Sequence, residues 1–127
     1  MDERLREFDF GLWEGLTWDE IAARFPDAAK AGATAARLYR PEGGETFALV
    51  RERVARWLSD IGSCESGRVV AVTHAGVLHA FVDILAPRVA ERPGFRFLPG
   101  SITRIDLSQS TPCIVSLDDV AHLAEIA

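Results

Sequence analysis

The chain has 127 residues, of which 48% are hydrophobic and 26% charged, and its formal net charge is −5. These values predict one globular domain over residues 1–127, and the acidic balance argues against a general surface for nucleic acids or anionic membranes. The chain starts with charged residues, shows no apolar signal region and contains no run long enough to cross a bilayer. We therefore expect a cytoplasmic protein that binds small soluble ligands.

The first half of the chain predicts helices. Thr17 and Glu20 have the spacing of a capping box, which predicts a short helix from there to about residue 24. Residues 28–38 are rich in alanine and are predicted to be helical. A longer helix is predicted from residue 47 to residue 61, because apolar residues recur there at steps of three and four: Phe47, Val50, Val54, Trp57, Leu58 and Ile61.

The second half predicts strands around one more helix. Residues 68–73 form an apolar run without alternation, which is typical of an interior parallel strand. An apolar helix follows His74 and ends before Pro87. Residues 102–107 and 113–117 are predicted to pair as a hairpin. The predicted fold class is α/β, with a layered, mostly parallel sheet flanked by helices.

A candidate anion site lies where the 68–73 run passes into the helix. His74 stands at the carboxyl end of the predicted strand, where backbone N–H groups and the helix dipole favour a bound anion such as phosphate. His74 and the N–H group of Ala75 are therefore candidate phosphate ligands. The plain alternative is a histidine that only satisfies hydrogen bonds at a strand end.

Cysteine and metal patterns point to no further chemistry. Cys64 and Cys113 are the two cysteines, and we expect both to be reduced thiols. The histidines, cysteines and carboxylates show none of the spacings typical of zinc or calcium sites. We expect neither a metal nor another cofactor.

Four stretches of the sequence, in register along the chain, resemble the motifs of one known family. Residues 5–17 (LREFDFGLWEGLT) are similar to the family's L-x-E-x-x-F-G-x-W-E-G-L-T stretch. Residues 43–46 resemble its Gly-Glu-Ser/Thr entry to a long helix, and residues 72–78 resemble its second-histidine motif. Residues 118–123 resemble its common C-terminal ending. The family is the histidine phosphatase superfamily of phosphoglycerate-mutase-like proteins. The resemblance covers essentially the whole chain and implies a phosphoglycerate-mutase-like fold.

The resemblance implies phosphoryl transfer to a histidine in an N-terminal Arg-His-Gly motif. By motif position, His74 takes the role of the second histidine, Glu7 that of the proton donor, and the Ala75 N–H that of a phosphate donor. This sequence contains no Arg-His-Gly, and His79 and His122 occur in other contexts. The resemblance thus implies a family fold that is incomplete at the N-terminus, and a protein with little or no catalytic turnover.

The remaining charged residues have simpler interpretations. Glu45 and Thr46 are expected to begin a helix, with Thr46 as the cap and Glu45 facing the dipole. Glu14 is expected to form hydrogen bonds rather than to act as a catalytic acid. The arginines around the long helix are expected to form a solvated face: Arg37, Arg40, Arg51, Arg53 and Arg56.

Three functions stay open at this point. The first is a phosphatase-type hydrolase whose attacking histidine is missing from these residues. The second is a non-catalytic protein that binds a phosphorylated small molecule or inorganic phosphate. The third is a structural remnant that assembles into homo-oligomers, because the predicted strand at 69–73 would have an unpaired, apolar edge.

Overall fold

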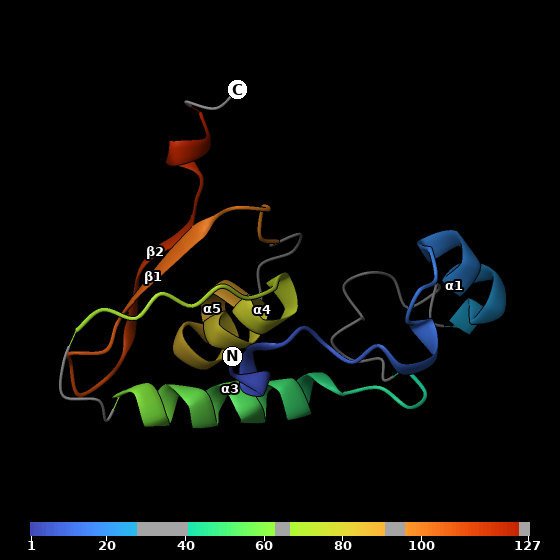
Figure 1. Ribbon diagram of the computed structural model, residues 1–127, viewed down its shortest axis with the longest axis horizontal. Coiled ribbons are helices and arrows are strands. Elements are labelled where there is room, and N and C mark those ends of the chain that lie inside the picture. Colours follow the sequence, from blue (N-terminus) through green and yellow to red (C-terminus); the bar gives the residue numbers. More distant parts are fainter. Residues whose placement is uncertain (28–40, 63–66, 91–95, 125–127) are drawn as a thin grey trace.

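The computed structural model describes residues 1–27, 41–62, 67–90 and 96–124. Three helices of seven or more residues lie in these ranges: α1 (Trp18–Arg24), α3 (Phe47–Gly62) and α4 (Ala75–Leu85). The short helix α5 (Pro87–Ala90) follows α4, and strands β1 (Ile102–Asp106) and β2 (Cys113–Asp119) come next. Single 3-10 turns are η1 (Glu3–Leu5), η2 (Gly11–Trp13) and η3 (Ala121–Leu123). Figure 1 shows α3 and α4 in the centre, with α1 and the β1–β2 hairpin at opposite ends.

The capping box predicted at the start of α1 is confirmed. The Thr17 hydroxyl accepts a hydrogen bond from the Glu20 N–H, and the Glu20 carboxylate accepts one from the Thr17 N–H at 2.8 Å. Ile21 on this helix packs against the buried Trp13 in a small separate cluster. The helix predicted over residues 28–38 lies outside the described residues.

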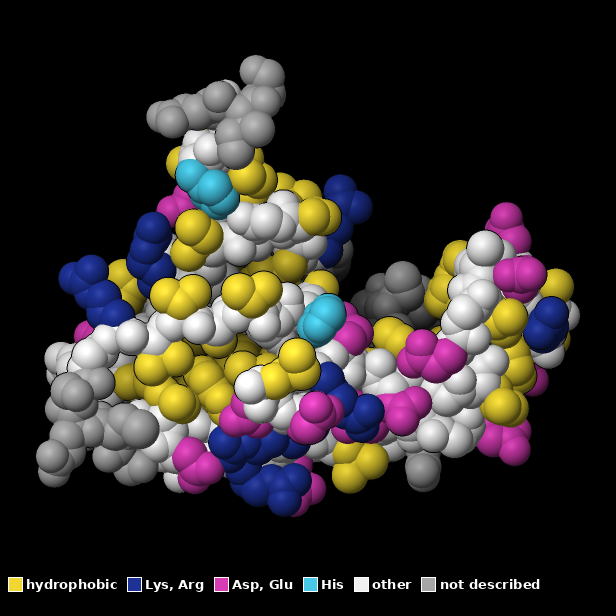
Figure 2. Space-filling view, viewed as in Figure 1, with side chains coloured by type: hydrophobic (Ala, Val, Ile, Leu, Met, Phe, Trp, Pro, Cys, Tyr) yellow, Lys and Arg dark blue, Asp and Glu magenta, His cyan; other side chains and the backbone are white. Residues whose placement is uncertain are grey.

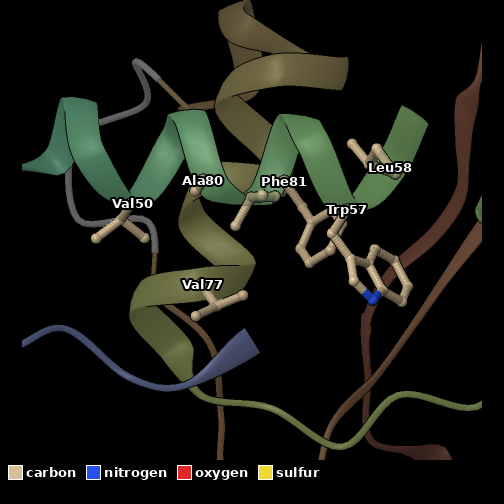
Figure 3. Packing of buried hydrophobic residues seen from close by; sticks show 7 residues of the cluster. Val50, Trp57, Leu58, Val77, Ala80 and Phe81 are labelled. Atoms are coloured by element: carbon tan, nitrogen blue, oxygen red, sulfur yellow. The ribbon is translucent and has the colours of Figure 1, made fainter. Parts of the chain in front are cut away.

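The main core lies between α3 and α4, where the structure confirms two predicted helices. Apolar side chains of both helices interdigitate, and Trp57 meets Phe81 edge to face with ring centroids 5.7 Å apart (Figure 3). Fully burying one large apolar side chain contributes about 1.5–3 kcal/mol. The packing of α3 against α4 buries several such side chains and is therefore a main source of stability for the described residues. The buried members are Val50, Val54, Trp57, Leu58, Val77, Ala80 and Phe81.

The predicted hairpin is confirmed, but the mostly parallel sheet is wrong for the described residues. β1 and β2 pair antiparallel, and they are the only strands in the described ranges. Residues 68–73 are extended yet belong to no sheet, and Val70 and Val72 are 89% and 93% exposed. An apolar run becomes an interior strand only where neighbouring strands and helices cover it, and no described strand lies beside this one.

Two glycines let the start of the chain cross the loop before α3. The Leu12 N–H donates to the Glu42 carbonyl at 3.0 Å, and the Glu45 N–H donates to the Asp9 carbonyl at 2.8 Å. A Cβ on Gly11, whose φ is +51°, would lie 2.2 Å from the Glu42 oxygen, and one on Gly44 would lie 2.5 Å from the Asp9 oxygen. The crossing therefore requires glycine at both Gly11 and Gly44. It holds the motif of residues 5–17 against the motif of residues 43–46.

Two further expectations can be compared with the structure. The Cys113 thiol is free and exposed, whereas Cys64 lies outside the described residues. None of the helices in the described ranges has the length and apolar character needed to cross a membrane.

Candidate functional site

An open cleft of about 250 Å³ lies at the amino end of α4. The described residues that line it are Glu7, Thr73, His74, Ala75, Leu78 and residues 97–101. The structure thus brings together all three residues that the sequence singled out, Glu7, His74 and Ala75, although Glu7 is far from the other two in sequence.

His74 is positioned by the backbone rather than by a side-chain contact. It is the N-cap residue of α4, with extended φ and ψ of −119° and 163°, and its carbonyl accepts the Leu78 N–H at 3.0 Å. The ring makes no capping hydrogen bond and is exposed. The imidazole is therefore free to meet a ligand in the cleft from the end of the helix where the dipole is positive.

Glu7 lies against the same helix end. One carboxylate oxygen accepts the Phe8 N–H at 2.9 Å, and the other accepts the Gly76 N–H at 3.3 Å. Gly76 makes this approach possible, because a Cβ there would lie 2.3 Å from the carboxylate and 2.5 Å from the Phe8 ring. A carboxylate thus satisfies one of the N–H groups that the first turn of α4 leaves without a helical partner.

A buried ion pair holds the Glu7 segment on α3. Arg53 is only 7% exposed, and its guanidinium donates two hydrogen bonds of 3.0 Å to the two oxygens of the Glu45 carboxylate. The same guanidinium donates to the Arg4 carbonyl at 2.6 Å and to the Glu7 carbonyl at 3.2 Å. We call these contacts the Arg53–Glu45 clamp. It fixes the backbone that carries Glu7.

The charge of Glu45 is stabilised in this clamp. Burial alone would raise the pKa of Glu45, but the hydrogen bonds from Arg53 and from the Asp9 N–H, with the nearby positive charges, outweigh it and hold the pKa below its usual value. Glu45 therefore stays ionised beside the arginine.

The clamp corrects two predictions. Arg53 is buried and does not belong to a solvated face. The Glu45 carboxylate forms an ion pair with Arg53 and accepts the Asp9 N–H, whereas the sequence predicted only an interaction with the dipole of α3. The sequence held a signal for Arg53, because it lies three residues after Val50 and four before Trp57, on the apolar stripe of α3. Thr46 does act as a cap, since its hydroxyl accepts the Leu49 N–H at 3.3 Å.

His79, His122 and Glu14 are not among the described residues that line the cleft. His79 packs edge to face on Phe97 with ring centroids 5.2 Å apart, and His122 lies in η3. Glu14 accepts a hydrogen bond from the Phe10 N–H at 2.9 Å, as its non-catalytic interpretation predicts. No group of three or more histidine, cysteine or acidic side chains in the described ranges is arranged to hold a metal ion.

Comparison with known proteins gives a consistent family. Residues 1–120 match the model of the histidine phosphatase superfamily, branch 1. The metal-independent phosphoserine phosphatase of Arabidopsis thaliana is 34% identical over 124 residues, which are 96% of this chain and 51% of that protein. Phosphoserine phosphatase 1 of Hydrogenobacter thermophilus is 24% identical, over 98% of this chain and 60% of that protein.

A solved structure agrees in fold as well as in sequence. Bacillus stearothermophilus YhfR superposes with a TM-score of 0.84 at 32% identity, over 97% of this chain and 62% of that one. The chain thus spans about half to three-fifths of the length of the proteins it matches. The helices and the hairpin belong to a mixed α/β fold of this type.

Proposed function

Because the chain belongs to the histidine phosphatase superfamily, we propose that it forms the phosphate-holding and proton-donating part of a phosphomonoesterase site. The observation that carries the proposal is the convergence of Glu7, His74 and Ala75 on one cleft at the amino end of α4. Imidazole and backbone N–H groups suit phosphoryl oxygens, and a carboxylic acid suits the leaving oxygen.

The proposal assigns one role to each residue. The His74 ring and the Ala75 N–H would bind oxygens of the phosphoryl group. Glu7 in its protonated form would give its proton to the ester oxygen as the bond from phosphorus to that oxygen breaks. The attacking histidine of an Arg-His-Gly motif is absent from this sequence, so residues 1–127 by themselves should hydrolyse little or no phosphomonoester.

The relatives suggest which substrate to test first. Two of them are named phosphoserine phosphatases, so we propose a phosphorylated small molecule as the ligand and choose phosphoserine as the first probe. Inorganic phosphate serves as the second probe, because it carries the group that the cleft would hold and lacks the leaving group.

The test separates binding from turnover. Phosphate should raise the melting temperature of the 127-residue protein, and His74→Ala should abolish that shift, while phosphoserine and p-nitrophenyl phosphate release no phosphate above background. His122→Ala is the matched control, because that histidine does not line the cleft. An unchanged phosphate shift in His74→Ala would contradict the site, and turnover with a phosphohistidine mapped to His74 would contradict the predicted lack of activity.

A non-catalytic or self-assembling role is the second candidate. The observation that favours assembly is the exposure of Val70 and Val72 on an extended segment that no described strand covers. We propose that this segment is an edge at which the chain forms homo-oligomers. Light scattering on the eluting protein tests this role independently of phosphate, and a monomer at all concentrations would contradict it.

A further inference from the structure

Residues 118–123, which resemble the family's C-terminal ending, have no role in the proposed function. The first of them, Asp118, has a φ of +53°, and in the described ranges it is the only residue other than glycine with a positive φ. This left-handed conformation is unfavourable for residues with a side chain, although aspartate tolerates it better than most. A local conformation of this kind points to a functional reason for keeping it.

Asp118 lies at a β-bulge in the hairpin of β1 and β2. Between two neighbouring pairs of the hairpin, residues 117 and 118 of β2 lie opposite the single residue Thr103 of β1. The Asp118 N–H donates to the Thr103 hydroxyl at 3.3 Å. A bulge turns a side chain away from its regular place in the sheet, and bulges are frequent next to active sites. The two flanking pairs are Ile102 with Asp119 and Arg104 with Ser116.

A tight turn over residues 98–101 forms part of the lining of the cleft. The Ser101 N–H donates to the Leu98 carbonyl at 3.2 Å and closes the turn. Pro99 and Gly100 occupy the two central positions, and the φ of +76° at Gly100 is the value that a type II turn requires there. All four residues line the cleft. We call them the cleft turn.

The C-terminal motif holds the cleft turn at two points. One oxygen of the Asp118 carboxylate accepts the Leu98 N–H at 2.9 Å. Leu123, at the end of η3, lies beside Gly100, since a Cβ on that glycine would be only 3.4 Å from a Leu123 methyl carbon. Figure 2 shows hydrophobic side chains gathered where the hairpin meets this C-terminal segment. The motif thus fixes where the cleft turn lies.

We propose that Asp118 is a positioning residue for the His74 cleft, and that the bulge aims its carboxylate so that the cleft turn becomes a wall for the part of a ligand beyond the phosphoryl group. The hold of Asp118 on the turn stands on the geometry alone. The contact between the turn and a ligand rests on the function proposed above.

The chemistry of the cleft turn explains why it would meet the organic part of a ligand. The N–H of Leu98 is taken by Asp118, that of Ser101 is taken within the turn, and Pro99 has none. The side chains of Leu98 and Pro99 are apolar, and Leu98 is 44% exposed. The turn therefore offers few donors to phosphoryl oxygens, whereas His74 and the Ala75 N–H suit them.

The first experiment tests the hold of Asp118 on the turn by hydrogen exchange of the 127-residue protein. Asp118→Gly tolerates the positive φ but removes the carboxylate, so the Leu98 amide should exchange at least about tenfold faster. Asp118→Asn keeps an oxygen that accepts the same N–H, so it should restore slow exchange. Asp119→Gly is the matched control, because the Asp119 carboxylate bonds to Arg104 and Ala121 instead. Unchanged Leu98 exchange in Asp118→Gly, or equal acceleration in the control, overturns the contact.

The second experiment tests what the turn does for a ligand. Calorimetry compares inorganic phosphate with p-nitrophenyl phosphate, which carries the same group and adds an organic part. Asp118→Gly should weaken the binding of p-nitrophenyl phosphate about tenfold and change that of inorganic phosphate by less than about twofold. Asp118→Asn should bind both probes as the wild type does. A loss in Asp118→Asn as large as in Asp118→Gly overturns the hydrogen bond to Leu98 as the cause.

The outcomes separate this inference from the proposed function. Equal losses for the two probes in Asp118→Gly, or wild-type affinity for p-nitrophenyl phosphate, overturn the role of the cleft turn and leave the phosphate site standing. A wild-type protein that binds neither probe contradicts the proposed function and, with it, the contact between the turn and a ligand. In that case the exchange of the Leu98 amide still decides whether Asp118 positions the turn.

Discussion

Glu7 and His74 line the same cleft, yet they reach it from two regions with opposite character. Glu7 lies on a backbone that a buried arginine holds by its carbonyls, and that arginine is itself neutralised by Glu45. His74 ends an extended segment whose valines are open to solvent and whose backbone groups pair with no described residue.

This difference shows which part of the cleft the chain builds by itself. The Arg53–Glu45 clamp satisfies its charges internally, so the position of Glu7 should be stable in a single copy. Residues 68–73 leave apolar surface and backbone polar groups uncovered by the described residues, so the position of His74 should depend on what pairs with that segment. Substitutions in the clamp should therefore affect the stability of the fold, whereas substitutions in residues 68–73 should affect assembly.

The largest expected effect comes from breaking the clamp. Arg53→Met should destabilise the protein by about 3–5 kcal/mol, because it removes the arginine from the Glu45 carboxylate and leaves the Arg4 and Glu7 carbonyls without their donor. Urea unfolding followed by tryptophan fluorescence measures this change. The comparison is with the exposed edge, where Val72→Thr in the monomeric range of concentration should change stability by less than about 0.5 kcal/mol.

Arg56→Met provides the matched control on the same helix. That arginine is exposed and only 3.9 Å from Glu52, a surface pair of small value. Its replacement should cost less than about 0.5 kcal/mol. Equal losses of unfolding free energy in Arg53→Met and Arg56→Met would mean that the clamp stabilises the fold no more than an exposed ion pair does.

A smaller effect is expected where the two regions meet, at Gly76. Alanine there gains up to about 1 kcal/mol of helix propensity but loses about 1–3 kcal/mol to crowding, because its Cβ would overlap the Glu7 carboxylate and the Phe8 ring. The Phe8 ring stacks against both Phe10 and Phe47, so we expect the Glu7 carboxylate to move. We expect a net loss of about 1 kcal/mol and a large shift of the Phe8 amide resonance. An unchanged Phe8 resonance would contradict the contact.

The sequence predicted the parts of this fold that local rules determine. The capping box of α1, the apolar stripe of α3, the stop of α4 before Pro87 and the hairpin all follow from neighbours in sequence. The helices, the capping box and the hairpin need few contacts between distant residues. His74 follows from its place between the 68–73 run and the next helix, Glu7 follows from the family resemblance, and the structure places both in one cleft.

The two wrong predictions concern residues whose burial depends on partners that are distant in sequence. Residues 68–73 have the composition of an interior strand, but burial depends on what lies beside them, which composition does not encode. The sequence predicts a solvated Arg53, because charge normally excludes a residue from the core. Its partner Glu45 lies eight residues earlier, in the loop before the helix, so no helical spacing revealed the pair.

The smallest effect we predict is a pH dependence of the clamp. The pKa of Glu45 is lower in the folded protein than in the unfolded chain, so its contribution to stability is complete above the unfolded value of about 4.3. That contribution is lost as the pH falls through the lower, folded value. One such group changes the free energy of unfolding by at most about 1.4 kcal/mol per pH unit.

The difference between wild type and Arg53→Met isolates this effect. Other carboxylates also have lowered pKa values, among them Asp2, where hydrogen bonds from Arg4 lower the pKa to about 2, but they are unchanged in the variant and cancel in the difference. In the variant Glu45 keeps its burial and loses the arginine, so protonation costs it little. The gap in stability should therefore be widest at pH 7 and narrow below about pH 4 in urea titrations. A gap that stays constant from pH 7 to pH 3 would show that Arg53 holds the Glu7 segment through the backbone carbonyls alone, without help from the charge of Glu45.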